Sequence, residues 1–127
     1  MSLRNKKIFL TGAKGTLGSH FLDILKSCGA KVDAPTKKEV DVSDILAISD
    51  AIGEKEYDLV IHCAAFTNVP KCEMAKHQKE VIETNIVGCS NIAYATGERY
   101  SIKTVYISTD YVYPCVRGNY TERDETS

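Results

Sequence analysis

The sequence has little proline and glycine, no long apolar run and no excess of charge of either sign. Three prolines and eight glycines among 127 residues are too few for a low-complexity linker. Sixteen basic and seventeen acidic residues leave a formal net charge of −1, which removes the electrostatic attraction that non-specific nucleic-acid binding requires. No apolar run approaches the roughly 20 residues of a membrane helix, and the run at 6–10 ends in a Thr-Gly turn too early for a signal peptide. We therefore expect a cytoplasmic location, with neither nucleic acid nor a membrane as partner.

The cysteines form no recognisable pattern, because their number is odd, they are widely spread and no Cys-x-x-Cys pair occurs. Neither a disulfide framework nor a zinc site is indicated, and we predict no metal site. With 43% hydrophobic and 26% charged residues the chain can bury a core, and its length suits one domain. We therefore treat residues 1–127 as one unit.

Short apolar runs alternate along the chain with segments of helical periodicity. Strands are predicted at 7–11, 31–34, 58–63 and 103–108. Helices are predicted over 17–28, over a segment that begins with Asp44 as N-cap, and over 82–97. This βαβαβαβ order generates an open parallel sheet with helices on both faces. We predict a Rossmann-type α/β fold, a doubly wound parallel sheet with strand order 3-2-1-4 that stops after about four strands.

A glycine-rich turn joins the first predicted strand to the first predicted helix. In Thr11–Gly18 (TGAKGTLG) three glycines stand three residues apart. The first would allow the sharp turn, the second would let a pyrophosphate approach the backbone, and the third would let the helix pack close to the sheet. The free N–H groups at the helix start would face the phosphates. A plain strand-to-helix turn is the alternative, but the position between a strand and an amphipathic helix favours a dinucleotide site. Its residues would be Gly12, Ala13, Lys14, Gly15, Thr16, Leu17 and Gly18.

The segment after the second strand, Asp33–Lys38 (DAPTKK), bears on the choice between NAD(H) and NADP(H). An acid at the strand tip would hydrogen-bond the ribose hydroxyls, whereas a lysine would pair with a 2′-phosphate. Asp33 stands about two residues too early for the acid's role. Lys37 or Lys38 therefore favours NADP(H) slightly over NAD(H). Two solvated lysines in a surface turn are the alternative interpretation.

Five segments carry a distinctive combination of motifs: Thr11–Gly18 (TGAKGTLG), Glu39–Asp44 (EVDVSD), Leu59–Glu73 (LVIHCAAFTNVPKCE), Thr84–Gly88 (TNIVG) and Tyr106–Tyr113 (YISTDYVY). In order and spacing they resemble the dTDP-4-dehydrorhamnose reductases of the extended short-chain dehydrogenase/reductase superfamily. The resemblance spans nearly the whole chain, and its most specific element is the Ser-Thr-Asp-Tyr-Val stretch. It implies the NAD(P)H-dependent reduction of a keto group on a nucleotide sugar.

The resemblance also implies roles for single residues. Expected beside the cofactor, in addition to the glycine turn and Lys37, are Asp41 and Val42 at the adenine, Ala64 and Ala65 after the third strand, and Ser108. Thr109 would hydrogen-bond the keto oxygen, with Asp110 as a further substrate contact. Asn85 would have a structural and proton-relay role. The alternatives are that Asn85 bonds backbone within its own helix and that Thr109 is only a strand-end cap.

The proton donor of such reductases is missing from these 127 residues. It is a tyrosine whose pKa is lowered by a lysine four residues later on the same helix, and none of the seven tyrosines here has a lysine at that spacing. The resemblance places the pair shortly after Tyr120–Ser127. We therefore expect the N-terminal, cofactor-binding portion of a longer reductase, inactive alone. Pro70 and Cys115 replace the acid and the glycine that are usual at those positions, which leaves the sugar unassigned.

Two other functions fit the same motifs. One is a non-catalytic dinucleotide-binding subunit, as in the regulatory subunit of methionine adenosyltransferase, which resembles the same reductases. The other is a fragment of a sugar-nucleotide epimerase or dehydratase, which shares the glycine turn and a Ser/Thr-bearing fourth strand. In each case a fourth strand left uncovered, with Val105, Tyr106 and Ile107 at its centre, would invite association into a homo-oligomer through the sheet edge.

Overall fold

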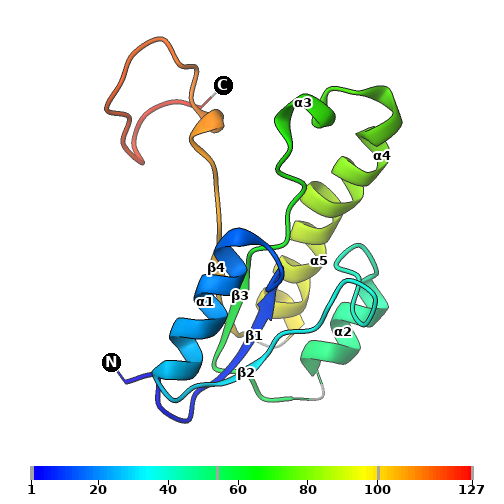
Figure 1. Ribbon diagram of the computed structural model, residues 1–127, viewed down its shortest axis with the longest axis vertical. Helices are drawn as coiled ribbons and strands as arrows, with labels where there is room; N and C mark the ends of the chain where they lie inside the picture. Colours follow the sequence, from blue (N-terminus) through cyan, green and yellow to red (C-terminus); the bar gives the residue numbers. More distant parts are fainter. Residues whose placement is uncertain (1, 54, 100, 127) are drawn as a thin grey trace.

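The computed structural model describes residues 2–53, 55–99 and 101–126, which form a parallel sheet with helices around it. The strands are β1 (Lys7–Thr11), β2 (Lys31–Asp33), β3 (Leu59–His62) and β4 (Lys103–Tyr106). The pairings of β1 with β2, of β1 with β3 and of β3 with β4 are all parallel. Helices cover both faces of the sheet (Figure 1). The predicted Rossmann-type α/β fold is therefore confirmed.

The predicted strand order 3-2-1-4 is wrong, because the observed order is β2-β1-β3-β4. β3 pairs with β1, with Ile8 opposite Leu59 and Thr11 opposite His62. The prediction assumed that the first three strands step in one direction before the chain reverses. Segment 34–44, where a further outer strand would form, contains no strand. After β2 the chain therefore crosses to the other side of β1, where β3 pairs with it, instead of adding β3 next to β2.

The helical elements alternate with the strands as the sequence predicts. They are α1 (Thr16–Ser27), α2 (Ile45–Gly53), α3 (Val69–Cys72), α4 (Gln78–Val81) and α5 (Gly88–Ala93). Two 3₁₀ turns, η1 (Ala75–His77) and η4 (Asp110–Val112), and two π-helical stretches, η2 (Ile82–Val87) and η3 (Tyr94–Arg99), complete the set in the described residues. The Asp44 carboxylate accepts the N–H groups of Leu46 and Ala47, so the predicted N-cap of α2 is confirmed. The predicted helix over 82–97 lies within a longer run, α4 to η3, which η2 interrupts at a type of bulge frequent at functional sites.

Two apolar clusters fix the helices on the two faces of the sheet. The cluster beneath α1 consists of Ile8, Leu10, Leu25 and Ile61. The cluster beneath α2 and α5 consists of Phe9, Val42, Ile48, Ile52, Tyr57, Val60, Ile92 and Ala95. β1 supplies both clusters because successive side chains of a strand point to opposite faces. The carboxyl ends of β1 and β3 are thus anchored from both sides.

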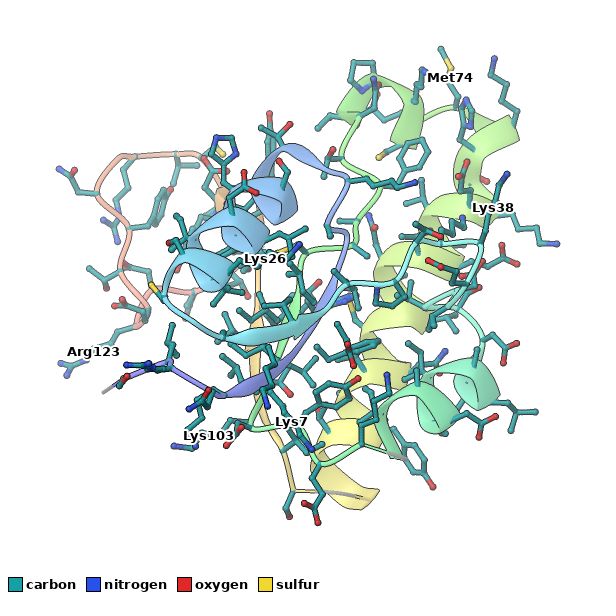
Figure 2. All side chains as sticks on the ribbon, turned by 60° about the horizontal axis from the view of Figure 1, so that its bottom comes forward. Lys7, Lys26, Lys38, Met74, Lys103 and Arg123 are labelled. Atoms are coloured by element: carbon teal, nitrogen blue, oxygen red, sulfur yellow. The ribbon has the colours of Figure 1, made fainter. Side chains whose placement is uncertain are left out.

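β4 is the exposed edge of the sheet. Within the described residues it pairs with β3 alone, and each of its residues is exposed, as expected for an uncovered strand. Lys7 and Lys103 lie at the end where the strands begin, and Met74, after α3, lies at the opposite end (Figure 2).

The helices in the described part of the chain are all too short or too polar to span a membrane.

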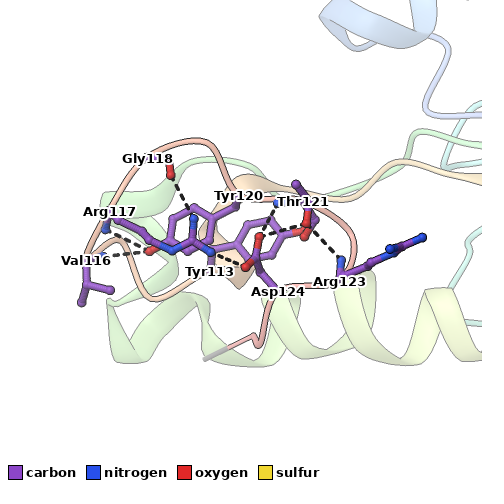
Figure 3. A network of polar contacts seen from close by, with 8 residues as sticks. All are labelled: Tyr113, Val116, Arg117, Gly118, Tyr120, Thr121, Arg123 and Asp124. Carbon is purple, nitrogen blue, oxygen red and sulfur yellow. Dashed lines mark hydrogen bonds and ion pairs between the residues drawn. The ribbon is translucent and has the colours of Figure 1, made fainter.

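The segment after η4 is held by contacts among its own residues. The rings of Tyr113 and Tyr120 stack with centroids 4.8 Å apart. The Arg117 guanidinium lies 4.7 Å from the centroid of Tyr120 and forms an ion pair with Asp124 (Figure 3). The Tyr113 hydroxyl donates to the carbonyl oxygen of Thr121. This segment stands beyond the carboxyl end of β4, on the other side of the sheet end from α3 (Figure 1).

Candidate functional site

Two adjoining cavities lie where β1, β3 and β4 end. The first, of about 310 Å³, is lined by the glycine turn and by the segments that follow β2 and β3. The second, of about 780 Å³, is lined by the start of α1 and by the segments that follow β3 and β4. They share a wall made of Gly15, Cys63, Ala64, Ala65 and Phe66. Open α/β sheets bind ligands at this edge, so an extended ligand could reach from one cavity into the other past Gly15.

Two glycines of the turn are required by its geometry. Gly12 has a φ of +72°, and a Cβ there would lie 2.6 Å from the backbone nitrogen of Ala64. At Gly18 a Cβ would collide with the carbonyl oxygen of Gly12, so α1 approaches the turn as closely as the sequence predicts. At Gly15 the nearest atom to an added Cβ is the Gly12 carbonyl oxygen, at 3.3 Å. Gly12 and Gly18 thus let backbone segments pack directly against one another, while Gly15 leaves the backbone of the turn open at both cavities.

The start of α1 offers backbone donors to this turn. Gly15 is the N-cap residue and no side chain caps the helix, nor is there an acidic residue in its first turn. The N–H groups of a helix start lack partners inside the helix and favour anions. The arrangement suits a phosphate or diphosphate group.

The first cavity carries charge from the segment after β2. Lys37 lines it, and its Nζ lies 3.8 Å from Oε1 of Glu80 on α4. Asp33 lines neither cavity, because its carboxylate accepts hydrogen bonds from Lys55, at 2.8 Å, and from the hydroxyl of Tyr57, at 2.6 Å. These two donors hold the pKa of Asp33 below its usual value. Both donors bind the same oxygen, Oδ2 of Asp33, and thereby orient this carboxylate outside the two cavity walls.

Asn85 clamps the segment after β3 from the π-helical stretch η2. Its Oδ1 accepts the N–H of Phe66 at 2.7 Å, and its Nδ2 donates to the Phe66 carbonyl oxygen at 3.0 Å. The Asn85 side chain therefore hydrogen-bonds both the N–H and the carbonyl of Phe66. Asn85 also lines the second cavity. The bonds go to another segment rather than to Asn85's own helix, so the alternative raised from the sequence is wrong.

Thr109 lines the second cavity beside Ser108. Its Oγ1 accepts the N–H of Tyr111 at 3.2 Å, which makes it the cap of η4, and lies 3.4 Å from Oδ1 of Asp110. The hydroxyl is thus both a cap and a group at the cavity wall. The bond to Asp110 is long, so the proton of Thr109 can turn to another acceptor.

Most of the predicted site residues are gathered in the two cavities. The first cavity is lined by the predicted residues Gly12, Ala13, Lys14, Gly15, Lys37, Val42, Ala64 and Ala65. The second is lined by the predicted residues Gly15, Thr16, Leu17, Gly18, Ala64, Ala65, Asn85, Ser108 and Thr109. Asp41 and Asp110 line neither. The Asp41 carboxylate instead accepts the N–H and the hydroxyl of Ser43.

A polar row that runs from the first cavity to the second was not predicted from the sequence. Thr11, His62 and Tyr106, the last residues of β1, β3 and β4, are paired in register, so their side chains share one face of the sheet. Oγ1 of Thr11 lies 2.7 Å from Nδ1 of His62 and accepts the N–H of Ala64, and the rings of His62 and Tyr106 stack 5.6 Å apart. Cys89 of α5 reaches both rings, with its Sγ 3.7 Å from Nε2 of His62 and 3.0 Å from the Tyr106 hydroxyl.

The row is uncharged at neutral pH. Burial lowers the pKa of His62 to about 4, and the hydrogen bond with Cys89, together with burial, raises the pKa of Tyr106 to about 12. With the Nε2–H tautomer of His62, Thr11 donates to the imidazole and the imidazole donates to the sulfur of Cys89. A sequence signal for this row does exist, since a polar or aromatic residue ends each of three apolar runs.

Among the described residues, no group of three or more side chains is placed to hold a metal ion.

Comparison with known proteins assigns the chain to a family. Residues 6–127 match the family described as the RmlD substrate binding domain. The chain belongs to this family. The resemblance to dTDP-4-dehydrorhamnose reductases that the motifs predict is thereby confirmed, since such reductases are among the relatives found.

Three relatives show how far the similarity to this RmlD-family chain extends. The spore coat polysaccharide biosynthesis protein SpsK of Bacillus subtilis is 35% identical over 84% of this chain and 37% of its own length. The dTDP-4-dehydrorhamnose reductase of Mycobacterium tuberculosis is 31% identical over 100% of this chain and 42% of its own length. A crystal structure of the dTDP-4-dehydrorhamnose reductase of Bacillus anthracis in complex with NADP is 31% identical, with a TM-score of 0.87 over 96% of this chain and 43% of that one. The chain thus spans about two fifths of the length of these relatives.

Proposed function

We propose that the chain binds NADH or NADPH across the two cavities and is the cofactor-binding part of a reductase that acts on a keto nucleotide sugar. The observation that carries this proposal is the meeting of both cavities at Gly15, where the absence of a side chain leaves the backbone of the turn accessible. A dinucleotide has two nucleoside ends joined by a diphosphate, which matches two cavities joined at a phosphate-binding turn. The family to which the chain belongs supports the same ligand.

The residues present fit the parts of such a cofactor. The turn Gly12–Gly18 and the start of α1 would hold the diphosphate. The first cavity, with Val42 and Lys37 in its wall, would hold the adenosine end. The second cavity, with Ser108 in its wall, would hold the nicotinamide end. Ala64, in the shared wall, would lie beside both.

We propose a modest preference for NADP(H). Asp33 lines neither cavity and its Oδ2 is bonded to Lys55 and Tyr57, which supports the view that it is not the acid that binds the ribose hydroxyls in NAD(H) sites. Lys37 lines the first cavity, where a 2′-phosphate would be accessible to its ammonium group. The related structure from Bacillus anthracis was solved with NADP, which supports this choice.

The chain's own groups would orient the substrate carbonyl. Bound NAD(P)H supplies a hydride to a carbonyl carbon. Thr109 would donate a hydrogen bond from its hydroxyl to the carbonyl oxygen and polarise it without giving up the proton, with Asp110 beside it as a second substrate contact. Asn85 would keep the Phe66 segment, and with it the shared wall, in place. No Tyr-x-x-x-Lys pair occurs in the 127 residues, so we propose that this chain alone binds cofactor without sustained turnover.

Binding is tested by titrating NADPH and NADH into the purified chain while following nicotinamide fluorescence. Gly15→Ala should weaken both by at least about tenfold, because a methyl group would stand where the diphosphate must approach the backbone. Its φ of −77° is accessible to alanine, so the fold should survive. Gly97→Ala is the matched control, because a Cβ there would meet nothing within 4 Å. Failure of the wild-type chain to bind either dinucleotide, or equal affinity in both variants, would overturn the proposal.

Turnover is tested separately by adding a 4-keto nucleotide sugar to the chain with NADPH and following absorbance of the reduced nicotinamide. We expect no sustained oxidation of the cofactor. Sustained oxidation by this chain alone would show that it contains a proton donor other than the Tyr-Lys pair, and would contradict the proposal that it is inactive alone.

A further inference from the structure

The first cavity contains a carboxylate that the proposed cofactor site does not need. The charged residues that line the cavity are Lys14, Lys37 and Glu80. Lys37 comes from the segment after β2 and Glu80 from α4, two elements that meet across this cavity. An acid in a site for a polyanionic ligand opposes binding, so its presence calls for a physical explanation.

Glu80 is held between two basic groups. Its Oε1 lies 3.8 Å from Nζ of Lys37, and its Oε2 lies 3.8 Å from Nδ1 of His77. The His77 ring packs against Phe66, with centroids 5.6 Å apart, and Phe66 belongs to the wall that both cavities share. The Glu80 carboxylate thus lies beside Lys37 as an ion pair in the cavity wall, with half of its side chain exposed.

We propose that Glu80 sets the cofactor preference of this chain by competing with a ribose 2′-phosphate for Lys37. This inference rests on the proposed binding of NAD(P)H. A phosphate monoester carries a charge of about −1.5 to −2 at pH 7, so it must displace Glu80 from Lys37 and then remain close to a like charge. NADH has no group at this position and meets neither cost. Glu80 thus weakens the binding of NADPH selectively and keeps both cofactors usable.

The competing interpretation is that the pair only ties α4 to the segment after β2. Removal of the carboxylate would then loosen the wall of the cavity and affect both cofactors alike. The two interpretations differ in the ratio of the two dissociation constants, which a purely structural role would leave unchanged.

The test measures dissociation constants of NADPH and NADH for the wild-type chain and for Glu80→Gln in a buffer of low ionic strength. We expect NADPH to bind about three- to fivefold more tightly to the variant, the range that partly exposed charge pairs produce, and NADH to change by less than about 1.5-fold. Raising the salt concentration to about 0.5 M should reduce the gain, because screening is then effective within a few ångströms.

Glu83→Gln is the matched control for loss of one negative charge on the same helical run. Glu83 pairs with Lys79 at 3.6 Å and lines neither cavity, so its variant should leave the NADPH-to-NADH ratio within about 1.5-fold of wild type. A second variant, Lys37→Gln, should abolish the effect of Glu80→Gln in the double mutant, because the competition requires the lysine.

Three results would overturn the inference: an equal shift for both cofactors in Glu80→Gln, the same ratio change in Glu83→Gln, or an undiminished effect in the Lys37→Gln background. If the wild-type chain bound neither dinucleotide, the proposed function itself would be wrong, and this inference with it. Measurable binding of both cofactors with an unaltered ratio would overturn only the role of Glu80.

Discussion

Acid should destabilise this protein through His62 before it affects the carboxylates. The side chain is 1% exposed, in contact with Thr11 and Cys89 and stacked on Tyr106, none of which carries a charge that could stabilise an imidazolium. Burial lowers the pKa of His62 from 6.5 to about 4. The folded state therefore requires the neutral ring over a range in which the unfolded chain accepts a proton.

The sign and size of the effect follow from linkage. Between pH 6.5 and pH 4 the unfolded state binds more protons than the folded state, so the free energy of unfolding falls as the pH falls. The whole difference in pKa corresponds to roughly 3 kcal/mol, of which about 2 kcal/mol is lost between pH 7 and pH 5. Asp33, Asp41 and Asp58, whose pKa values are lowered in the folded state, contribute losses of stability mainly below the ordinary aspartate pKa of 3.8.

Urea unfolding followed by far-ultraviolet circular dichroism at pH 7, 6 and 5 measures the effect. His62→Gln keeps a hydrogen-bonding side chain without a titrating group, so it should lose far less stability over this range than the wild type, whatever its stability at pH 7. Comparison of slopes removes the contributions of all groups that the two chains share. Equal losses in both chains, at equal m-values, would refute the assignment of the acid sensitivity to His62.

Two further substitutions separate binding from stability. Asn85→Ala should cost about 1–3 kcal/mol of stability, since it leaves the Phe66 N–H without its side-chain partner and the Phe66 carbonyl with only the Cys72 thiol, and should weaken NADPH binding by roughly tenfold. Unchanged affinity in the fluorescence titration would show that the clamp does not shape the site. Asp33→Asn should leave NADH affinity within about twofold while lowering the urea midpoint, because the carboxylate contacts Lys55 and Tyr57 rather than the first cavity; a large loss of NADH affinity would contradict that separation.

Features that depend on a few neighbouring residues, such as turns, helix caps and strand positions, could be predicted from the sequence. The glycine turn predicts both the close approach of α1 at Gly18 and the sharp turn at Gly12, because each requirement is a property of the few residues around it. The N-cap at Asp44 is predicted for the same reason. Apolar runs locate all four strands within two residues of their ends.

Relations between distant segments are what the sequence could not supply. The predicted strand order was wrong because the apolar pattern of a strand does not indicate on which side of β1 that strand pairs. The row of Thr11, His62 and Tyr106 depends on the register between strands, and the pair of Lys37 with Glu80 depends on the fold bringing α4 and the segment after β2 to the same cavity. The bonds that Oδ1 of Asp41 accepts from Ser43 were likewise not predicted, and the place of Asp41 beside the adenine stays a prediction.

The wall that both cavities share is fixed by contacts from two directions. Ala64 donates its N–H to Thr11 in β1, and Phe66 is held through both of its backbone groups by Asn85 of η2. β1 lies in the buried core, so the segment between the two cavities is tied to the most constrained part of the fold. A ligand that spans both cavities would therefore meet a wall already ordered, which lowers the entropic cost of binding. The far wall of the second cavity, from Ser108 to Val112, has no buried residue, so the shared wall is the side of that cavity tied to the buried core.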